Sequence, residues 1–338
     1  MDEHDGPFHA GEIALQQRAG VRAQVAAAGA RMLRDHLPEQ HREFYAQLPT
    51  LLVGALDAAR RPWATMLVGT PGFVHSPDPR RLRIAALPDA ADVLAGRLAP
   101  GARVGLLGLQ PATRRRNRMN GVVAALDAAG FEVEVELSFG NCPQYIQARE
   151  PAWVETPAPA AQPFGATLPA AAAALVAHAD TFFIASAADG AGRAEGVDVS
   201  HRGGRPGFVR LQARPDGGTR LSFPDFRGNN LFNTLGNLAR WPWAGLLFVD
   251  PATGDRLQLA GRTTVDWDGA ELAAFAGALR LVHVDVAEGA WTPAALPLRW
   301  SAPAYAPQLA ATGRWEAVSD MSDTHTGAAT MEPAGGAA

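Results

Sequence analysis

The apolar residues of the chain gather in short runs that start at Thr50 and are separated by clusters of Gly, Pro, Asp and Asn. Runs of this length and punctuation predict β-strands in a small antiparallel barrel or sandwich. The residues before them, 12–48, are rich in Ala, Gln and Arg and predict helix, with breaks at Gly20 and Pro38. The pattern therefore predicts a mainly β protein with helices (α+β), preceded by an N-terminal helical segment over residues 1–48.

The strand-like runs form two sets, divided by a segment rich in Pro and Ala over residues 151–168. The first set covers residues 49–150, with one helical stretch predicted over 91–98, and the second covers 169–314. A segment of this composition is typical of a linker between domains. Residues 315–338 predict a disordered tail.

Matching peptides recur in the two sets in the same order. Pro-Gly-Phe-Val begins at Pro71 and again at Pro206, and the Leu-Pro-Asp of 87–89 is answered by the Phe-Pro-Asp of 223–225. The distance between partners grows slowly along the chain, as loop insertions would produce. We therefore expect an internal duplication; the alternative is two similar strand patterns that coincide.

The composition restricts the chemistry that the protein can perform. All 30 basic residues are arginine, because the sequence contains no lysine. This excludes a Schiff-base lysine and a Walker A lysine, so a bound phosphate would be held by Arg, hydroxyl, amide or backbone N–H groups. The formal net charge of −4 and the pI of about 6.1 argue against nucleic acid or a membrane as a partner.

Several other classes of site lack their signatures. Cys142 is the only cysteine, so an intrachain disulfide and a Cys-rich metal site are excluded, and we expect no metal. The motifs GxGxxG, GxxxxGK, GxSxG and HExxH are absent, so the sequence predicts no Rossmann, P-loop, hydrolase or zincin site. The acidic first residues are not followed by an apolar run, and we therefore expect a cytoplasmic protein.

The most unusual stretch, 198–233, combines two strand patterns with a loop of Arg, Gly and Asn before a helical pattern that begins near Leu231. Such a loop offers a guanidinium, carboxamides and backbone N–H groups to an anion at a helix N-terminus. We expect the residues 227–230 to bind a phosphate together with Ser200 and Arg202. The alternative is an ordinary turn and helix cap, since Asn and Gly are favoured in both.

The first set of strands carries complementary chemistry in the run 114–118 and in the segment 139–149. In a strand, Arg114, Arg116 and Arg118 share one face and could line an anionic ligand's cleft; the alternative is a solvated strand end. The corresponding parts of the second set are less polar, whereas its loop 227–230 is replaced in the first set by AADVLAGRL. Each half therefore keeps a different part of what could be one shared site.

The order of these motifs resembles the pyridoxamine 5′-phosphate oxidase-like family of FMN-binding split β-barrels, in particular its bacterial members with two repeats. The matching motifs are PGFVR, PD-x-RGNN, TLGNL and WAGLLFVD, and the resemblance covers most of residues 50–300. It implies two tandem split β-barrel repeats that form a pseudo-dimer, with FMN between them. Oxidases that act on pyridoxamine phosphate carry Arg-Lys where this chain has Gly228-Asn229-Asn230, so the resemblance does not extend to their substrate.

The resemblance also implies which residues hold FMN. Its phosphate would contact the strand and loop over 223–230, its ring would lie against 207–210, and the first repeat would supply the other wall. The residues expected at the cofactor are Ser200, Arg202, Gly207, Phe208, Val209, Arg210, Phe223, Pro224, Asp225, Arg227, Gly228, Asn229, Asn230, Arg116, Arg118, Asn141, Cys142, Gln144 and Tyr145. We expect Arg227→Ala to weaken FMN binding about 10- to 150-fold, the value of one charge-assisted hydrogen bond.

These observations predict an FMN-dependent oxidoreductase that binds one FMN per chain and takes a small-molecule substrate or an electron donor such as NAD(P)H. It would be a monomer with pseudo-dimeric repeats or a homodimer. The alternative is a non-catalytic protein that carries or senses a flavin or haem, with His201 or His283 as haem ligands. A third possibility is a structural duplicate that binds nothing.

Overall fold

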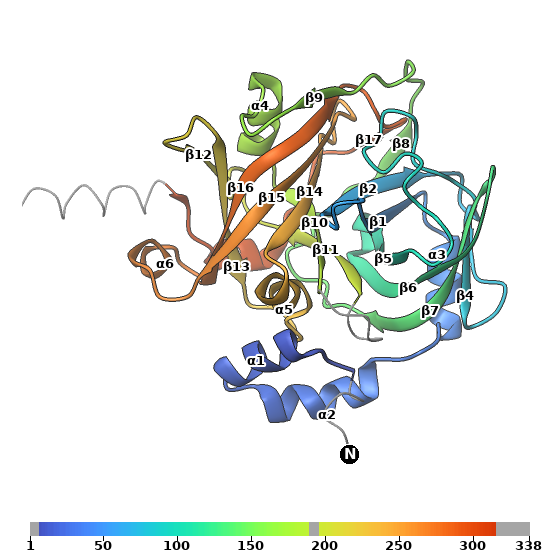
Figure 1. Ribbon diagram of the computed structural model, residues 1–338, viewed down its shortest axis with the longest axis horizontal. Coiled ribbons are helices and arrows are strands. Elements are labelled where there is room, and N and C mark those ends of the chain that lie inside the picture. The colour runs from blue at the N-terminus through green and yellow to red at the C-terminus, as the bar shows by residue number, and fades with distance from the viewer. Residues whose placement is uncertain (1–6, 189–195, 316–338) are drawn as a thin grey trace, which may run out of the picture.

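The computed structural model describes residues 7–188 and 196–315, which form two antiparallel β-sheets with helices at their edges (Figure 1). This confirms the mainly β, α+β class. The first sheet contains β1 (Thr50–Leu56), β2 (Pro62–Val68), β3 (Val74–His75), β4 (Arg81–Ile84), β5 (Arg103–Gln110), β6 (Arg115–Asp127) and β7 (Gly130–Gly140). The second contains β10 (Thr181–Ala187), β11 (Val197–Gly203), β12 (Arg210–Ala213), β13 (Thr219–Phe226), β14 (Trp243–Val249), β15 (Arg256–Asp266) and β16 (Ala278–Thr292).

The strands follow the same order in both sheets. The first runs β2-β1-β5-β6-β7-β4-β3 and the second β11-β10-β14-β15-β16-β13-β12, so each strand of one sheet has a counterpart in the other. Within the described residues neither sheet closes into a barrel, because the strands at the two ends of each order do not pair. The shared order agrees with a duplication, which itself stays a prediction.

The two sheets pack directly on each other through a shared apolar cluster that includes Leu52, Leu107, Phe183 and Leu247. The backbones approach so closely that a Cβ on Gly105 of β5 would collide with the Val197 carbonyl of β11. Glycine is therefore required at this crossing. The polar start of β6 and the loop after β13 both lie where the two sheets meet.

The N-terminal segment forms three short helices, α1 (Ala10–Arg18), α2 (Arg22–Met32) and α3 (Glu39–Ala46). Gly20, with φ of 69°, breaks the first from the second, and Pro38 precedes the third. Figure 1 shows α1 and α2 beneath α5 (Asn233–Arg240), at one end of the molecule. Two further helices, α4 (Ala170–His178) and α6 (Ala270–Ala274), lie beside the second sheet.

The helix predicted over 91–98 is wrong, because the chain there forms a series of turns. The carboxylates of Asp89 and Asp92 accept hydrogen bonds from the backbone N–H groups of Ala91 and Leu94, at 2.9 and 2.8 Å. Such local bonds compete with helical ones and favour turns. The same two carboxylates also contact the second sheet, as described below.

The Pro- and Ala-rich segment 151–168 contributes two short strands to the fold. β8 (Pro151–Trp153) pairs with β17 (Leu298–Trp300), and β9 (Gln162–Phe164) pairs with β16. Most of the tail predicted over 315–338 lies outside the described residues, which end at Trp315. No helix in the described ranges is both long and apolar enough to cross a membrane.

Candidate anion-binding cavity

A cavity of about 130 Å³ lies where the two sheets meet, beside the start of α5. The first sheet contributes β6 and the segment after β7, and the second contributes β11 and the loop between β13 and α5. The predicted site residues that line it are Arg116, Arg118, Asn141, Cys142, Gln144, Tyr145, Ser200, Arg202, Phe208, Pro224, Asp225, Arg227, Gly228, Asn229 and Asn230. The structure therefore brings together the two stretches that the sequence separates, one from each half.

Four predicted residues do not line this cavity. Phe223 and Val209 are buried in the core of the second half, where the ring of Phe223 packs edge-on against Phe182. Arg210 lies on β12, where it contacts the Glu271 carboxylate at 2.6 Å. Gly207, with φ of 80°, makes a turn before β12. These four residues therefore belong to the core, a turn and an ion pair of the second half rather than to the cavity wall.

The cavity has a large excess of positive charge. Arg202 and Arg280 share the carboxylate of Asp225, at 2.9 and 2.6 Å, and Arg227 is exposed at the rim. Arg118 pairs with Asp198 at 3.2 Å and is 5% exposed. With Arg116, these make five guanidinium groups around the Asp225 carboxylate in the wall and the Asp198 carboxylate behind it.

Arg116 is half-buried and, like the exposed Arg227, has no carboxylate partner in the described part of the chain. It donates to the Cys142 carbonyl at 2.8 Å and contacts Nδ1 of His201 at 3.3 Å. Burial, followed by repulsion from Arg118 and Arg202, lowers the pKa of Arg116 to about 10. The group stays charged at neutral pH, and an anion in the cavity would relieve both causes.

Buried polar atoms in the cavity wall also lack partners. Among the described residues, Nε of Arg118, Nε of Arg202 and Oδ1 of Asn141 make no hydrogen bond. Cys142 is half-buried and contributes its carbonyl oxygen to Arg116, so the contact made here does not involve its thiol. The donors that remain free are those that bind a phosphate or carboxylate group.

His201 forms the back wall of the cavity and is 6% exposed. Burial and the neighbouring Arg116 and Arg202 hold the pKa of His201 well below its usual range, so the ring is neutral. Because a guanidinium can only donate, Nδ1 accepts from Arg116 and Nε2 carries the proton. Nε2 is therefore not available to ligate haem iron in this arrangement.

His283, the other candidate haem ligand, lies outside the cavity. Its Nδ1 is 2.8 Å from the Ser222 hydroxyl on the neighbouring strand β13. Within residues 7–188 and 196–315, no three His, Cys, Asp or Glu side chains lie together where they could hold a metal. The described cavity thus offers cationic and amide donors and no accessible metal ligand set.

The loop before α5 holds an unusual backbone conformation. Asn230 and Phe232 have φ of 59° and 66°, and Tyr145 on the opposite wall has φ of 62°. A left-handed conformation is costly for a bulky residue such as Phe232, and such strain is concentrated at functional sites. The carboxamide Oδ1 of Asn229 accepts from Leu231 N at 3.1 Å, which tightens the turn.

This turn directs the N-terminus of α5 at the cavity. Asn233, Thr234 and Leu235, the first residues of the helix, line the wall, and no side chain caps the terminus. The unpaired N–H groups and the helix dipole both favour a bound anion here. The helix pattern predicted near Leu231 thus begins two residues later, with its amino end at the site.

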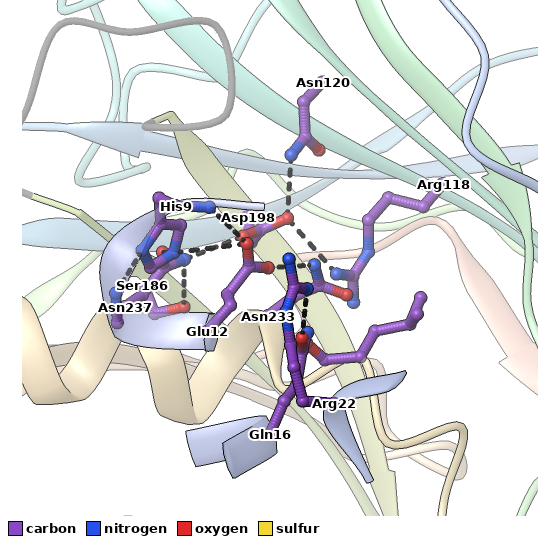
Figure 2. A network of polar contacts seen from close by, with 12 residues as sticks. His9, Glu12, Gln16, Arg22, Arg118, Asn120, Ser186, Asp198, Asn233 and Asn237 are labelled. Atoms are coloured by element: carbon purple, nitrogen blue, oxygen red, sulfur yellow. Dashed lines mark hydrogen bonds and ion pairs between the residues drawn. The ribbon is translucent and has the colours of Figure 1, made fainter. Parts of the chain in front are cut away.

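Behind the wall lies a buried polar network that the sequence did not predict (Figure 2). Asp198 is its centre and accepts hydrogen bonds from Asn120 and Asn237, both at 2.7 Å, in addition to its pair with Arg118. Ser200 contacts both Arg118 and Thr234. The network fixes the guanidinium of Arg118 against the cavity.

Helix α1 completes this network from the N-terminal segment. The Glu12 carboxylate accepts from Asn233 Nδ2 at 2.5 Å, and His9 contacts Asn237 at 2.9 Å. A Cβ on Gly236 of α5 would overlap the backbone of α1, which shows how closely the two helices pack. Burial, and then the charge of Asp198, raise the pKa of Glu12 to about 8.

Some of these residues left no signal in the sequence. Arg280 lies in an ordinary strand pattern. Glu12 lies more than 200 residues before its partner Asn233, and the sequence around Glu12 is typical of a solvent-exposed helix. Asp198 could have been noticed as a carboxylate between two valines in a strand, since such a residue is rarely buried without a partner.

Comparison with known proteins gives little beyond these residues. No protein-family profile matches the chain. No curated protein is significantly similar to it. Two crystal structures of HupZ from Group A Streptococcus, of the protein and of a single-residue variant, each match 33% of this chain with 10% identity and a TM-score of 0.25. The match covers 83% of the HupZ chain and 88% of the variant chain. Similarity of this extent does not identify a family.

Proposed function

We propose that the cavity binds the phosphate of FMN and that the protein is a flavoprotein, an oxidoreductase of the pyridoxamine 5′-phosphate oxidase-like class with an unknown substrate. The observation that carries this proposal is Arg116, a charged group with no carboxylate partner among the described residues, beside the arginines 118 and 202. A dianionic phosphate supplies the charge that the wall lacks, and α5 directs its amino end at the same point.

The enclosed volume suits the phosphate end of FMN. At about 130 Å³ it is smaller than the roughly 300 to 1,000 Å³ of pockets that enclose whole ligands. The flavin ring would extend toward the rim, where the rings of Tyr145 and Phe226 stack with centroids 5.1 Å apart. When bound, FMN supplies the electron chemistry, and the protein supplies binding, orientation and polarity.

The residues of the chain then act as follows. Arg116 and Arg202 bind the phosphate, while Asp225 holds the guanidinium of Arg202 in place. Asp198 does the same for Arg118 from behind the wall. His201, neutral and fixed by Arg116, orients that guanidinium rather than exchanging a proton.

A flavin carrier or sensor is the second candidate. In the described cavity wall the Asp225 carboxylate is bound by two arginines, and the neutral ring of His201 accepts from Arg116, so neither group is positioned as a general acid or base. A yellow preparation that is bleached by NADPH and recovers in air supports the oxidoreductase. A stable colour that ignores reductants supports the carrier, and a Soret band would redirect the case to haem.

A titration with FMN and riboflavin tests the phosphate site directly, because the two ligands differ only in the phosphate. We expect the intact protein to prefer FMN, and Arg116→Gln to weaken FMN binding about 10- to 150-fold while leaving riboflavin binding nearly unchanged. Arg115→Gln is the matched control, because this neighbour on β6 is exposed and its guanidinium lies over the Phe44 ring. Equal loss for FMN and riboflavin would contradict the assignment.

A further inference from the structure

A second and larger cavity, of about 510 Å³, lies on the far side of His201. It is formed by the ends of β1, β5, β10 and β14, with α4 and β17 at its edge. His201 borders both cavities. No other described residue lines both, so the second cavity is separate from the proposed phosphate site. Neither the sequence motifs nor the proposed function accounts for it.

The lining of this cavity is mainly apolar and aromatic. Its larger side chains are Leu52, Met66, Leu109, Phe183, Trp291 and Trp300. The volume falls within the roughly 300 to 1,000 Å³ of pockets that enclose a whole small ligand. Aromatic walls favour flat rings, which stack on them, and cations, which interact with their faces.

The charges at the cavity are predominantly acidic. One arginine, Arg149, is among the described residues of the lining. Both its terminal nitrogens bind the Asp180 carboxylate, at 3.2 and 2.8 Å, so its charge is neutralised. Asp250 and Asp255 also line the cavity, and they accept hydrogen bonds from backbone N–H groups. Neither carboxylate forms an ion pair with a cation in the described ranges, so the cavity carries uncompensated negative charge.

We infer that this cavity is a second ligand site, which takes a flat aromatic molecule bearing a cationic group. The aromatic body fits the apolar walls, and the cation complements Asp250 and Asp255. The first cavity has the opposite character, since it is small and positively charged. A ligand in the second cavity would contact the ring whose Nδ1 accepts from Arg116.

Calorimetric titration of the full chain with 9-aminoacridine, a planar aromatic cation, tests this inference. We expect this probe to bind, and 1-anilinonaphthalene-8-sulfonate, an aromatic anion, to bind the cavity at least tenfold more weakly. Absence of 9-aminoacridine binding, or equal affinity for the two probes at this cavity, would overturn the inferred ligand class.

Two tryptophan substitutions on α4 locate the binding. Ala174 is exposed and lines the cavity mouth, so Ala174→Trp should reduce 9-aminoacridine affinity at least tenfold. Ala177 is exposed on the same helix away from the cavity, and Ala177→Trp should leave the affinity unchanged. Asp250→Asn, which keeps an oxygen for the turn at Ala252, should reduce affinity about fivefold. Equal affinity of the two tryptophan variants contradicts the site.

The inference stands apart from the proposed function, and one further variant separates them. Arg116→Gln should leave 9-aminoacridine binding unchanged, and Ala174→Trp should leave FMN binding unchanged. Tighter 9-aminoacridine binding in Arg116→Gln, the result of removing a charge that repels the cation, would place the probe in the anion cavity and overturn the second site. Thermal unfolding of both tryptophan variants, which we expect to match, shows that the comparison is between folded proteins.

Discussion

Arg116 and Arg256 occupy the same position in the two sheets but have opposite surroundings. β6 and β15 hold the same place in the two strand orders. Arg116 lies opposite Leu109 of β5, and Arg256 lies opposite Val249 of β14, and each of these partners follows a Gly-Leu-Leu tripeptide by two residues. Arg256 is 1% exposed and binds Asp89 at 2.7 Å and Asp92 at 3.0 Å. Arg116 contacts a carbonyl oxygen and a neutral imidazole.

The neighbours of the two arginines correspond as well. Gln258 follows Arg256 on the same strand face, as Arg118 follows Arg116, and Gln258 donates to Asp92 at 3.1 Å. The hydroxyl of Thr65 on β2 contacts Asp92, as that of Ser200 on β11 contacts Arg118. The loop of the first half, which faces Arg256, contains the carboxylates of Asp89 and Asp92. The corresponding loop of the second half, which lines the cavity with Arg116, contains glycine and asparagine at 228–230. One of the two places is therefore neutralised internally, whereas the arginine of the other has no carboxylate partner among the described residues.

The largest expected effect comes from exchanging each arginine for glutamine. Arg256→Gln leaves the buried carboxylate of Asp92 and the partly exposed carboxylate of Asp89 without their cation and should lower the free energy of unfolding by about 3 to 5 kcal/mol. Arg116→Gln removes a cation that its neighbours repel and should leave this free energy unchanged or raise it. Urea unfolding of both variants without FMN measures the contrast. Equal destabilisation would break the comparison between the two places.

The next test concerns the N-terminal helix α1, which lies behind the cavity that contains Arg116. Its contacts there are with Asn233 and Asn237 of α5. The pKa of Glu12 is raised to about 8 in the folded protein, from 4.5. The unfolded chain therefore ionises first as pH rises, and folded stability declines by up to about 1.4 kcal/mol per pH unit across this window. Glu12→Gln should remove that part of the decline.

Urea unfolding of the intact protein and of Glu12→Gln at several pH values between 4.5 and 8 separates Glu12 from the other titrating groups, which the two proteins share. We expect the stability difference between the two proteins to change across the window. Parallel pH profiles would show that Glu12 is ionised when folded. In that case α1 would add a negative charge to the network around Asp198.

The sequence predicted the strands better than the way they meet. Apolar runs with turn residues are local signals, so most strands fell where the pattern placed them, and the shared site followed from two stretches with complementary residues. The helix over 91–98 failed because Asp89 and Asp92 bind backbone N–H groups and, across the interface, Arg256. That ion pair joins residues 167 positions apart, and no local pattern reveals it. The position of Arg280 beside Asp225 and the existence of the second cavity were not predicted for the same reason, because both arise from residues that are distant in the sequence.

The smallest effect is expected for Arg227, which the sequence placed foremost in the phosphate loop. In the structure this side chain is exposed at the rim, whereas Arg116 lies deeper, between the sheets. A solvated charge contributes about 0.2 to 1 kcal/mol, so Arg227→Ala should weaken FMN binding by a factor of about 1.4 to 5, and high salt should abolish the difference. This replaces the larger loss expected from the sequence. FMN titrations at low and high salt measure it, with Arg116→Gln in parallel. A loss for Arg227→Ala that equals the loss for Arg116→Gln and persists in salt would place the phosphate at the rim, outside the cavity that distinguishes the two halves.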